Sequence, residues 1–232
     1  TLDNLAWHGI TDIALNLHHH PELIRDCFGN GSQRDLNLLY SYEPVLLGTA
    51  GGVKKLERFF SRNTFVVMSG DGLCDINIAA AVEFHRAARA LATIVVKKVD
   101  TRFEYGVVVT NKQSRIQRFV EKPSWSDVFT NTVNTGIYIL EPEILALIPK
   151  GKFYDFGTLL WPYLLKKRQR LYAYEHKGYW CDVGNLAEYR RAQHDALQGK
   201  IKLVISGKEI NPGVWVDKDT KISPGVRLVP PC

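Results

Sequence analysis

Apolar runs rich in valine and isoleucine alternate with helical patterns in the first part of the chain, and this rhythm limits the fold more than any other feature. The run DIALNL (12–17) precedes helical PELIRDCF, LNLLYSYE (36–43) precedes TAGGVKKLERFF, and TFVVMS precedes INIAAAVEFHRAARA. Such alternation is typical of a parallel-dominated sheet with helices on its faces. We therefore expect a Rossmann-like α/β fold.

The rhythm changes after residue 100. YGVVVTN (105–111) and RIQRFVEK (115–122) are separated by the short polar segment KQS, which predicts a hairpin and hence antiparallel pairing. We therefore expect a mixed, mainly parallel sheet with helices on both faces. NLAEYRRAQHDALQG (185–199) is typical of a long helix that ends at Gly199.

The period changes again in the tail. Ile210, Val216, Ile222 and Leu228 are six residues apart, and Pro-Gly recurs at 212–213 and 224–225. This spacing indicates a hexapeptide repeat, which builds a left-handed parallel β-helix. The alternative is a tail rich in proline and glycine with chance spacing. We predict two domains, 1–206 and 207–232, the second being the start of a β-helix.

Composition narrows the function classes. The 232 residues carry 30 Lys and Arg against 24 Asp and Glu. The basic residues are dispersed, and their densest cluster, Lys166-Lys167-Arg168, is expected at a helix end, so nucleic-acid binding is not favoured. The apolar runs are too short for a membrane helix, and the start lacks the features of a signal peptide, so we expect a cytoplasmic protein. The four cysteines form no Cys-x-x-Cys pair, which predicts reduced thiols.

Asp71 follows the uncharged run FVVMS and stands between two glycines. In open α/β sheets ligands bind outside the carboxyl ends of the strands, so this carboxylate is placed for a ligand or a metal. The alternative is a tight turn, because Asp-Gly is a strong turn signal. Asp182, in YWCDVG, repeats the arrangement after a second strand. Two such carboxylates can share one Mg²⁺, whose remaining ligands are substrate phosphates and water.

Three further stretches are candidate binding segments. In LLGTAGG (46–52), the backbone amides of Gly48, Thr49, Ala50 and Gly51 open a helix and can face a flat or anionic ligand, although Thr49 would serve equally as a helix N-cap. Glu121 and Lys122 end a strand in FVEKPS and point to opposite faces unless the chain bends at Pro123.

The third stretch, VNTGIY (133–138), places polar Asn134 and Thr135 inside an apolar strand. A sugar hydroxyl or the backbone must satisfy these side chains. By contrast, we assign no metal role to the consecutive residues His18, His19 and His20, because consecutive side chains at a strand end point in different directions.

Six ordered motifs carry a resemblance to a known family: LGTAGG, SGDGLCDI, YGVV, FVEKPS, VNTGIYILEPE and GYWCDVG, followed by the hexapeptide tail. The chain resembles the sugar-1-phosphate nucleotidyltransferases, in particular the bacterial mannose-1-phosphate guanylyltransferase and glucose-1-phosphate nucleotidyltransferase types. The resemblance implies transfer of a nucleotide from a nucleoside triphosphate to a sugar 1-phosphate. It also implies homo-oligomers joined through the β-helix of the full-length protein.

The resemblance implies a role for each matching residue. Asp71 and Asp182 would hold the catalytic Mg²⁺, and Lys122 would contact the sugar phosphate. Sugar hydroxyls would be bound by Glu121, Asn134 and the backbone at Gly106. Gly48 and Thr49 would lie near the nucleotide base.

This sequence also departs from the family pattern. The family's Gly-rich G-G-x-G-T-R loop and its Pro-Lys have no counterpart here, Leu46 replaces a proline, and Asn185 replaces a threonine. TLDNLAWHGI is typical of the second half of a helix. We therefore expect a fragment of a longer enzyme that is inactive alone, or else a degenerate, non-catalytic relative.

Two other functions compete with that of a transferase. A sugar-nucleotide-binding regulatory subunit would keep the sugar pocket, but it would not need both metal carboxylates. A nicotinamide-dependent oxidoreductase is disfavoured because no G-x-G-x-x-G follows a strand.

Overall fold

The computed structural model describes residues 1–60, 62–99, 105–124 and 129–232. These residues form two compact units. The first unit contains Thr1–Ser69 and Asn77–His176, and the second contains Gly70–Ile76 and Lys177–Cys232. Each unit is described by itself. The predicted domain boundary at residue 206 remains a prediction, since the compact units divide the chain at other points.

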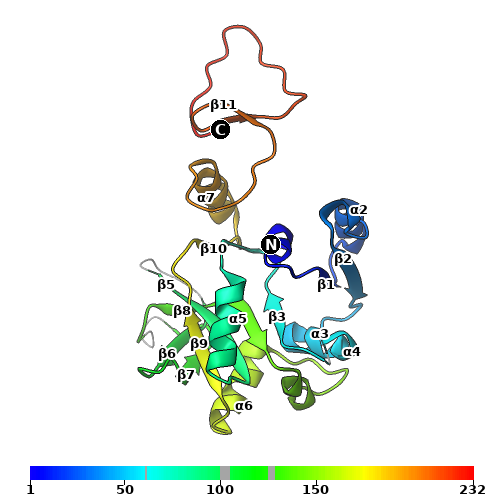
Figure 1. Ribbon diagram of the computed structural model, residues 1–232, viewed down its shortest axis with the longest axis vertical. Helices are drawn as coiled ribbons and strands as arrows, with labels where there is room; N and C mark the ends of the chain where they lie inside the picture. Colours follow the sequence, from blue (N-terminus) through cyan, green and yellow to red (C-terminus); the bar gives the residue numbers. More distant parts are fainter. Residues whose placement is uncertain (61, 100–104, 125–128) are drawn as a thin grey trace. The chain divides into compact units, whose positions relative to one another are not determined.

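A six-stranded sheet forms the centre of the first unit, with strand order β7-β6-β8-β5-β9 and β3 also paired to β8 (Figure 1). Its strands are β3 (Phe65–Met68), β5 (Ala92–Lys98), β6 (Val107–Thr110), β7 (Ile116–Val120), β8 (Thr132–Leu140) and β9 (Leu171–Glu175). The predicted hairpin is confirmed, because β6 and β7 pair antiparallel.

The sheet is mixed, as the sequence predicts. β3, β5, β6 and β9 run in one direction, whereas β7 and β8 run in the other. Parallel neighbours within this sheet occur only at β5 and β9 among the described residues. The reason is that β8 inserts beside β3, β5 and β6 and is antiparallel to each of them.

Helices cover both faces of this sheet. His85, on α5 (Ile78–Ala87), bonds to Thr93 of β5, so α5 covers the face that carries Thr93. Trp161, on α6 (Trp161–Lys166), belongs to the same buried cluster as Ile94. Because successive strand residues point to opposite faces, α5 and α6 lie on opposite sides of β5. The expectation of helices on both faces is therefore confirmed.

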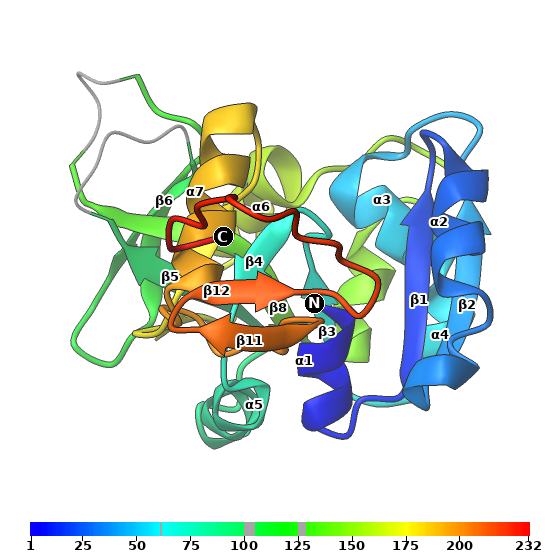
Figure 2. The same ribbon diagram turned by 90° about the horizontal axis from the view of Figure 1, so that it is seen from above.

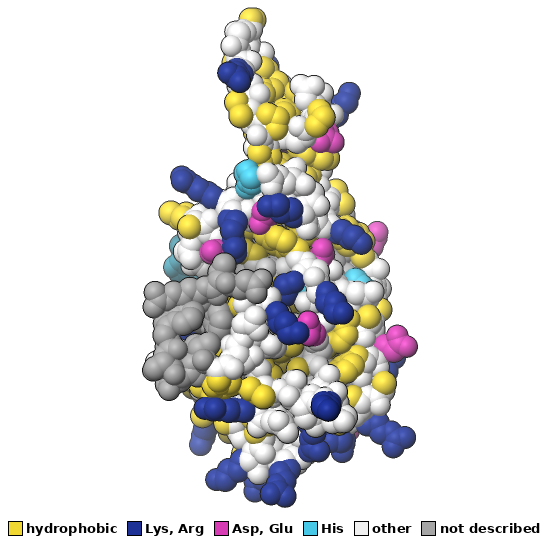
Figure 3. Space-filling model, turned by 90° about the vertical axis from the view of Figure 1, so that its left-hand side faces the viewer, with side chains coloured by type: hydrophobic (Ala, Val, Ile, Leu, Met, Phe, Trp, Pro, Cys, Tyr) yellow, Lys and Arg dark blue, Asp and Glu magenta, His cyan; other side chains and the backbone are white. Residues whose placement is uncertain are grey.

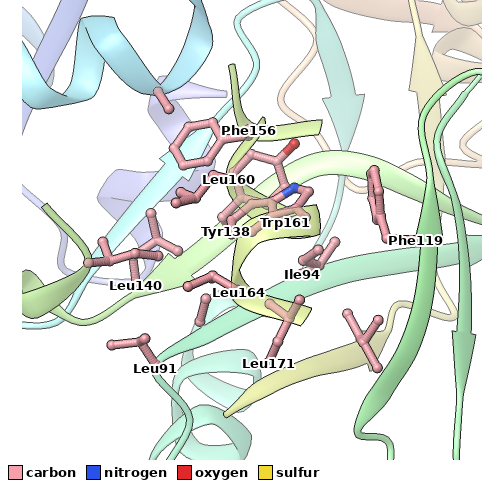
Figure 4. Close-up of a cluster of buried hydrophobic side chains, with 14 of the residues drawn as sticks. Leu91, Ile94, Phe119, Tyr138, Leu140, Phe156, Leu160, Trp161, Leu164 and Leu171 are labelled. Atoms are coloured by element: carbon pink, nitrogen blue, oxygen red, sulfur yellow. The ribbon is translucent and has the colours of Figure 1, made fainter. Parts of the chain in front are cut away.

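Three aromatic rings pack together in the core on the α6 side (Figure 4). The Phe156 and Trp161 rings are stacked, with centroids 5.0 Å apart, and the Tyr138 ring meets Trp161 edge-on, also at 5.0 Å. Phe156 begins a π-helix, Phe156–Leu160, that continues directly into α6. The core therefore immobilises both β8 and the segment that precedes α6.

A separate two-stranded parallel sheet pairs β1 (Asp12–Leu17) with β2 (Asn37–Tyr42) (Figure 2). The other helices of the first unit are α1 (Leu2–Trp7), α2 (Pro21–Phe28), α3 (Gly48–Lys55) and α4 (Glu57–Phe60), with 3₁₀ turns at Ser32–Arg34 and Pro142–Leu147. The predicted alternation of strand and helix is therefore present.

The second unit combines a short antiparallel pair, a helix and the tail. β4 (Gly72–Cys74) pairs with β10 (Trp180–Asp182), and α7 (Leu186–Leu197) follows. Asn185 caps α7 by accepting from the Glu188 amide, and Gly199 is left-handed just after its end, as the sequence predicts. In the tail, β11 (Lys208–Asn211) and β12 (Val214–Val216) form an antiparallel pair.

Basic side chains gather at one end of the first unit. Figure 1 shows α6 at its lower end, and Figure 3 shows Lys and Arg side chains concentrated there. Lys166 is the last residue of α6, which confirms the expected helix end. Among the residues that the structure describes, no helix has the length and apolarity needed to cross a bilayer.

The N-cap of α5 provides a first prediction. The Asn77 side chain accepts a hydrogen bond of 3.0 Å from the Ala80 amide. Asn77→Ala should lower the free energy of unfolding by about 1 kcal/mol, because that amide loses its partner. Asn77→Ser, which restores an acceptor, should recover most of the loss in a denaturant titration. Equal losses in the two variants would contradict a capping role.

Candidate active site

The two predicted metal ligands lie side by side in the second unit. Asp71 immediately precedes β4, and Asp182, the last residue of β10, is paired with Gly72. The Val183 amide donates to the Asp71 carbonyl at 3.1 Å, which continues the pairing past the strands. The structure therefore places the backbones of two residues that are far apart in the sequence on adjacent strands.

The surroundings of this pair suit a magnesium ion. Asp71 is exposed, and Oδ2 of Asp182 lies toward Gly184, where no side chain obstructs approach. No group of three or more His, Cys, Asp or Glu side chains suited to a metal occurs among the described residues. Mg²⁺ typically takes one or two protein carboxylates and completes its octahedron with phosphate and water, so the pair fits this ion.

The first unit holds the other predicted residues, beginning where β7 ends. The chain leaves β7 at Glu121 and turns at Lys122, whose φ of +42° lies in the left-handed region. The bend expected at Pro123 therefore occurs one residue earlier. A non-glycine residue is costly in this conformation, and such strain clusters at ligand-binding sites.

The Glu121 carboxylate is wedged between two glycine backbones. A β-carbon built on Gly106 would lie 2.7 Å from Oε2 of Glu121, and one built on Gly157 would overlap the same oxygen. Burial raises the pKa of Glu121, the nearby Asp155 carboxylate raises it further, and the Lys122 ammonium partly offsets both effects. Glu121 is thus confined at the end of β7, and its pKa is raised above the usual value for a glutamate.

Asn134 and Thr135 of β8 differ in what they can offer a ligand. The Thr135 side chain is buried, with 4% exposed, and its hydroxyl donates to the Val95 carbonyl at 2.8 Å. The sequence left a sugar hydroxyl or the backbone as the partner of Thr135, and in the structure the backbone satisfies the donor of its hydroxyl. A substrate contact of Thr135 stays a prediction. The Asn134 amide group donates to the Tyr138 hydroxyl at 3.0 Å and accepts from the Gly136 amide, which fixes its orientation beside the Glu121 region.

The Gly106 backbone is partly used by the sheet. Its carbonyl accepts a hydrogen bond of 2.8 Å from the backbone amide of Asn134. This bond joins the start of β6 to β8 and holds Gly106 against the Glu121 carboxylate. Gly106, Glu121 and Asn134 are therefore three neighbours in one part of the first unit.

The start of α3 contacts the segment 152–156. Gly48 has a φ of +76°, and a β-carbon there would lie 2.7 Å from the Tyr154 carbonyl, so the position needs glycine. That carbonyl accepts the amides of Ala50 and Gly51, which the sequence assigned to a ligand. The expectation for these two amides is corrected: the protein itself satisfies them.

Thr49 is not the N-cap of α3, because the helix begins at Gly48 after Leu47. Its hydroxyl donates to Oδ2 of Asp155 at 2.7 Å and accepts from the Phe156 amide at 2.9 Å. The Thr49 side chain therefore joins α3 to the beginning of the π-helix.

Asp155 and Gly157 are the residues that sequence reasoning missed. Burial alone would raise the pKa of Asp155, but hydrogen bonds from Thr158 and Thr49 outweigh it and lower the pKa. The available signal was the spacing of Asp155 and Thr158, which is typical of a helix N-cap. For Gly157 no local pattern existed, because its partner Glu121 is distant in sequence.

The three consecutive histidines, to which the sequence assigned no metal role, lie between β1 and α2. His18 bonds through Nδ1 to the Glu43 carbonyl at 2.7 Å, and His20 is the left-handed N-cap of α2. The rings of His19 and His20 pack at a centroid distance of 3.9 Å.

Comparison with known proteins identifies relatives for nearly the whole chain. The family model described as nucleotidyl transferase matches residues 1–199. A UTP–glucose-1-phosphate uridylyltransferase of Synechocystis sp. is 38% identical over 92% of this chain and 59% of its own length. A mannose-1-phosphate guanylyltransferase of Mycobacterium tuberculosis is 29% identical over 98% of this chain and 68% of its own length. A mannose-1-phosphate guanyltransferase of Yarrowia lipolytica is 34% identical over 99% and 62%, so the chain spans roughly three-fifths to two-thirds of these relatives.

Solved structures share the fold. HddC from Yersinia pseudotuberculosis, complexed with GMP-PN, superposes with a TM-score of 0.70 and 24% identity over 82% of this chain and 81% of its own. An apo UDP-glucose pyrophosphorylase has a TM-score of 0.70 and 19% identity over 86% of each chain. At these identities the likeness shows the mixed α/β fold alone.

Proposed function

Because the chain belongs to the nucleotidyl transferase family, we propose that it transfers a nucleotidyl group from a nucleoside triphosphate to a sugar 1-phosphate, with release of pyrophosphate. The pairing of β4 with β10 carries this proposal, because it puts Asp71 and Asp182 at neighbouring positions. A protein that only bound sugar nucleotides would have no need of this carboxylate pair.

Asp71 and Asp182 are the residues that would hold Mg²⁺ in this proposal. Their carboxylates supply the two oxygen ligands that this ion takes from proteins when phosphates and water supply the rest. Bound Mg²⁺ would neutralise charge on the triphosphate and make its α-phosphorus a better electrophile.

The sugar 1-phosphate would be bound by the first unit. Lys122 would pair with the sugar phosphate as a charge-assisted hydrogen-bond donor, and Glu121 would accept hydrogen bonds from sugar hydroxyls. Asn134 and the Gly106 backbone would complete the sugar subsite, which the Gly106–Asn134 bond holds together. Gly48 and Thr49 would lie near the nucleotide base at the start of α3.

The chemistry needs positioning more than covalent participation by the protein. An oxygen of the sugar phosphate attacks the α-phosphorus, a new P–O bond forms, and the bond to the β-phosphate oxygen breaks in line with it. Pyrophosphate leaves with the bonding electrons. Lys122 would reduce the repulsion between the two anionic reactants as they approach.

Turnover of the protein with each sugar 1-phosphate against each nucleoside triphosphate tests this function. We expect pyrophosphate release for glucose or mannose 1-phosphate with one preferred base, and loss of the release when a chelator removes divalent metal. Binding of a sugar nucleotide, without turnover of any pair, would instead support a regulatory subunit and contradict the proposal.

Lys122→Ala should weaken the binding of one substrate much more than that of the other. We expect sugar 1-phosphate to bind roughly tenfold more weakly, because one charge-assisted contact is lost, whereas triphosphate binding should change little. Lys112→Ala, which removes an exposed charge in the β6–β7 turn, is the matched control. Titration calorimetry with each substrate measures the difference. Equal losses for both substrates would contradict the assigned contact.

We propose that 207–232 begins a left-handed parallel β-helix through which copies of the full-length protein associate. The six-residue spacing supports it, whereas the antiparallel pairing of β11 with β12 does not. The four free thiols support residence in a reducing, cytoplasmic compartment.

A further inference from the structure

Three segments of the first unit converge on Asp155. They are the start of α3, the π-helix that begins at Phe156, and the turn after β7 that carries Glu121. In the proposed function the first segment lies near the nucleotide and the third binds the sugar. Asp155 belongs to neither binding set, so its contacts need a separate explanation.

The contacts on the α3 side use one carboxylate oxygen and the adjacent backbone. Oδ2 of Asp155 accepts the Thr49 hydroxyl at 2.7 Å, and that hydroxyl accepts the Phe156 amide at 2.9 Å. The Tyr154 amide donates to the Leu47 carbonyl at 2.8 Å. Residues on both sides of Asp155 therefore hold the start of α3 in one position.

The other carboxylate oxygen controls the segment that faces Glu121. Oδ1 of Asp155 accepts from the Thr158 amide at 2.8 Å and from the Thr158 hydroxyl at 3.0 Å. These bonds fix the first turn of the π-helix, which contains Gly157. The Gly157 backbone in turn lies against the Glu121 carboxylate, with no room for a β-carbon.

We propose that Asp155 is a positioning residue that ties the start of α3 to the Glu121 carboxylate, so that the nucleotide and sugar subsites keep one relative geometry. The proposal rests on the proposed function for the identity of the two subsites. Capping of the π-helix needs only Oδ1 of Asp155, which accepts the Thr158 amide. The bond from Oδ2 to Thr49 is the additional contact, and it reaches the other subsite.

Charge provides a second link between the same residues. Within the described residues, Glu121 interacts with three titratable groups, Asp155, Lys122 and Tyr138. The Asp155 carboxylate raises the pKa of Glu121, so removing its charge should lower that pKa. Glu121 would then stay ionised to lower pH, and any acid limb that its protonation causes in sugar binding should move to lower pH.

The first experiment needs no enzymatic activity. The Glu121 carboxyl carbon is followed by NMR during a pH titration of protein labelled at glutamate, and Glu121→Gln assigns the signal. We expect Asp155→Asn to lower the pKa of Glu121. Thr49→Val, which keeps the shape of threonine and changes no charge, should lower it in the same direction. Oδ2 of Asp155 loses its Thr49 partner and can shift away from Glu121, while Oδ1 stays bonded to Thr158. An unchanged Glu121 titration in folded Thr49→Val would overturn the proposal.

The second experiment uses turnover. Thr49→Val should reduce kcat/KM for sugar 1-phosphate roughly three- to tenfold, although Thr49 belongs to the nucleotide subsite, and Thr49→Ser should recover most of the loss. Thr110→Val, on an exposed threonine of β6, is the control. The double variant Thr49→Val/Asp155→Asn should be little worse than Asp155→Asn alone. The coupling would be contradicted if the losses of the two single variants multiplied in the double variant. It would also be contradicted if Thr49→Val changed kcat/KM for the triphosphate alone.

The two experiments separate this inference from the proposed function. If the wild-type protein turns over no sugar 1-phosphate, the proposed function fails, and the NMR titration still decides whether Asp155 positions Glu121. If turnover is present but Thr49→Val affects neither the Glu121 titration nor sugar kinetics, only the inference fails.

Discussion

Asp71→Asn and Asp182→Asn are each expected to lower turnover by roughly a hundredfold or more, because losing one metal ligand removes several kcal/mol of transition-state stabilisation. The side chains keep their size, and neither carboxylate is part of a buried cluster, so the unfolding temperature should change little. Pyrophosphate release at saturating substrates, measured across a Mg²⁺ titration, is the readout.

Asp75→Asn is the matched control for this pair. Asp75 lies in the same unit, and its Oδ1 accepts the Tyr179 amide at 2.7 Å, a bond that an asparagine oxygen can keep. We expect its turnover to remain within a few-fold of wild type. Near-normal Mg²⁺-dependent turnover in either Asp71→Asn or Asp182→Asn would remove both residues from the metal site.

Gly157→Ala is expected to lower kcat/KM for sugar 1-phosphate by roughly a hundredfold, because the added methyl group displaces the Glu121 carboxylate and misplacement by about 1 Å can cost that much. The atom it meets is the far end of a flexible side chain, so Glu121 can move aside and the fold should survive. Kinetics for each substrate and a thermal melt on the same samples measure the two effects.

A second substitution tests the cause of that loss. Glu121→Asp shortens the acid by one methylene and makes room for the new methyl group. In the double variant Gly157→Ala/Glu121→Asp, activity should therefore exceed the product of the two single effects. Independent, multiplying losses would show that Gly157→Ala acts on some other part of the protein.

Local patterns were sufficient for much of the fold. The alternation of apolar runs and helical segments predicted strands and helices in the right order, since burial of one face imposes a period that is visible in the sequence. The β6–β7 hairpin followed from two apolar runs with a short polar turn between them. The central, antiparallel position of β8 did not follow, because pairing partners are chosen by contacts between distant segments.

The candidate site divides in the same way. Asp71, Asp182, Glu121 and Lys122 were recognisable because charged residues at strand ends are locally unusual, and the order of the motifs pointed to the family. For Thr135 the sequence left two partners open, since a hydroxyl in an apolar strand gives the same local signal whether a ligand or a backbone carbonyl satisfies it. Only the fold put the Val95 carbonyl within reach.

The sequence by itself determined the α/β class, the family, and the carboxylates of Asp71, just before β4, and Asp182, at the end of β10, because these depend on residue type and spacing along the chain. Only the tertiary structure decided that Asp71 and Asp182 are neighbours, that Thr49 bonds to Asp155, and that Gly157 confines Glu121. These relations join residues from separate segments, so the contacts that set their geometry leave no periodic trace in the sequence.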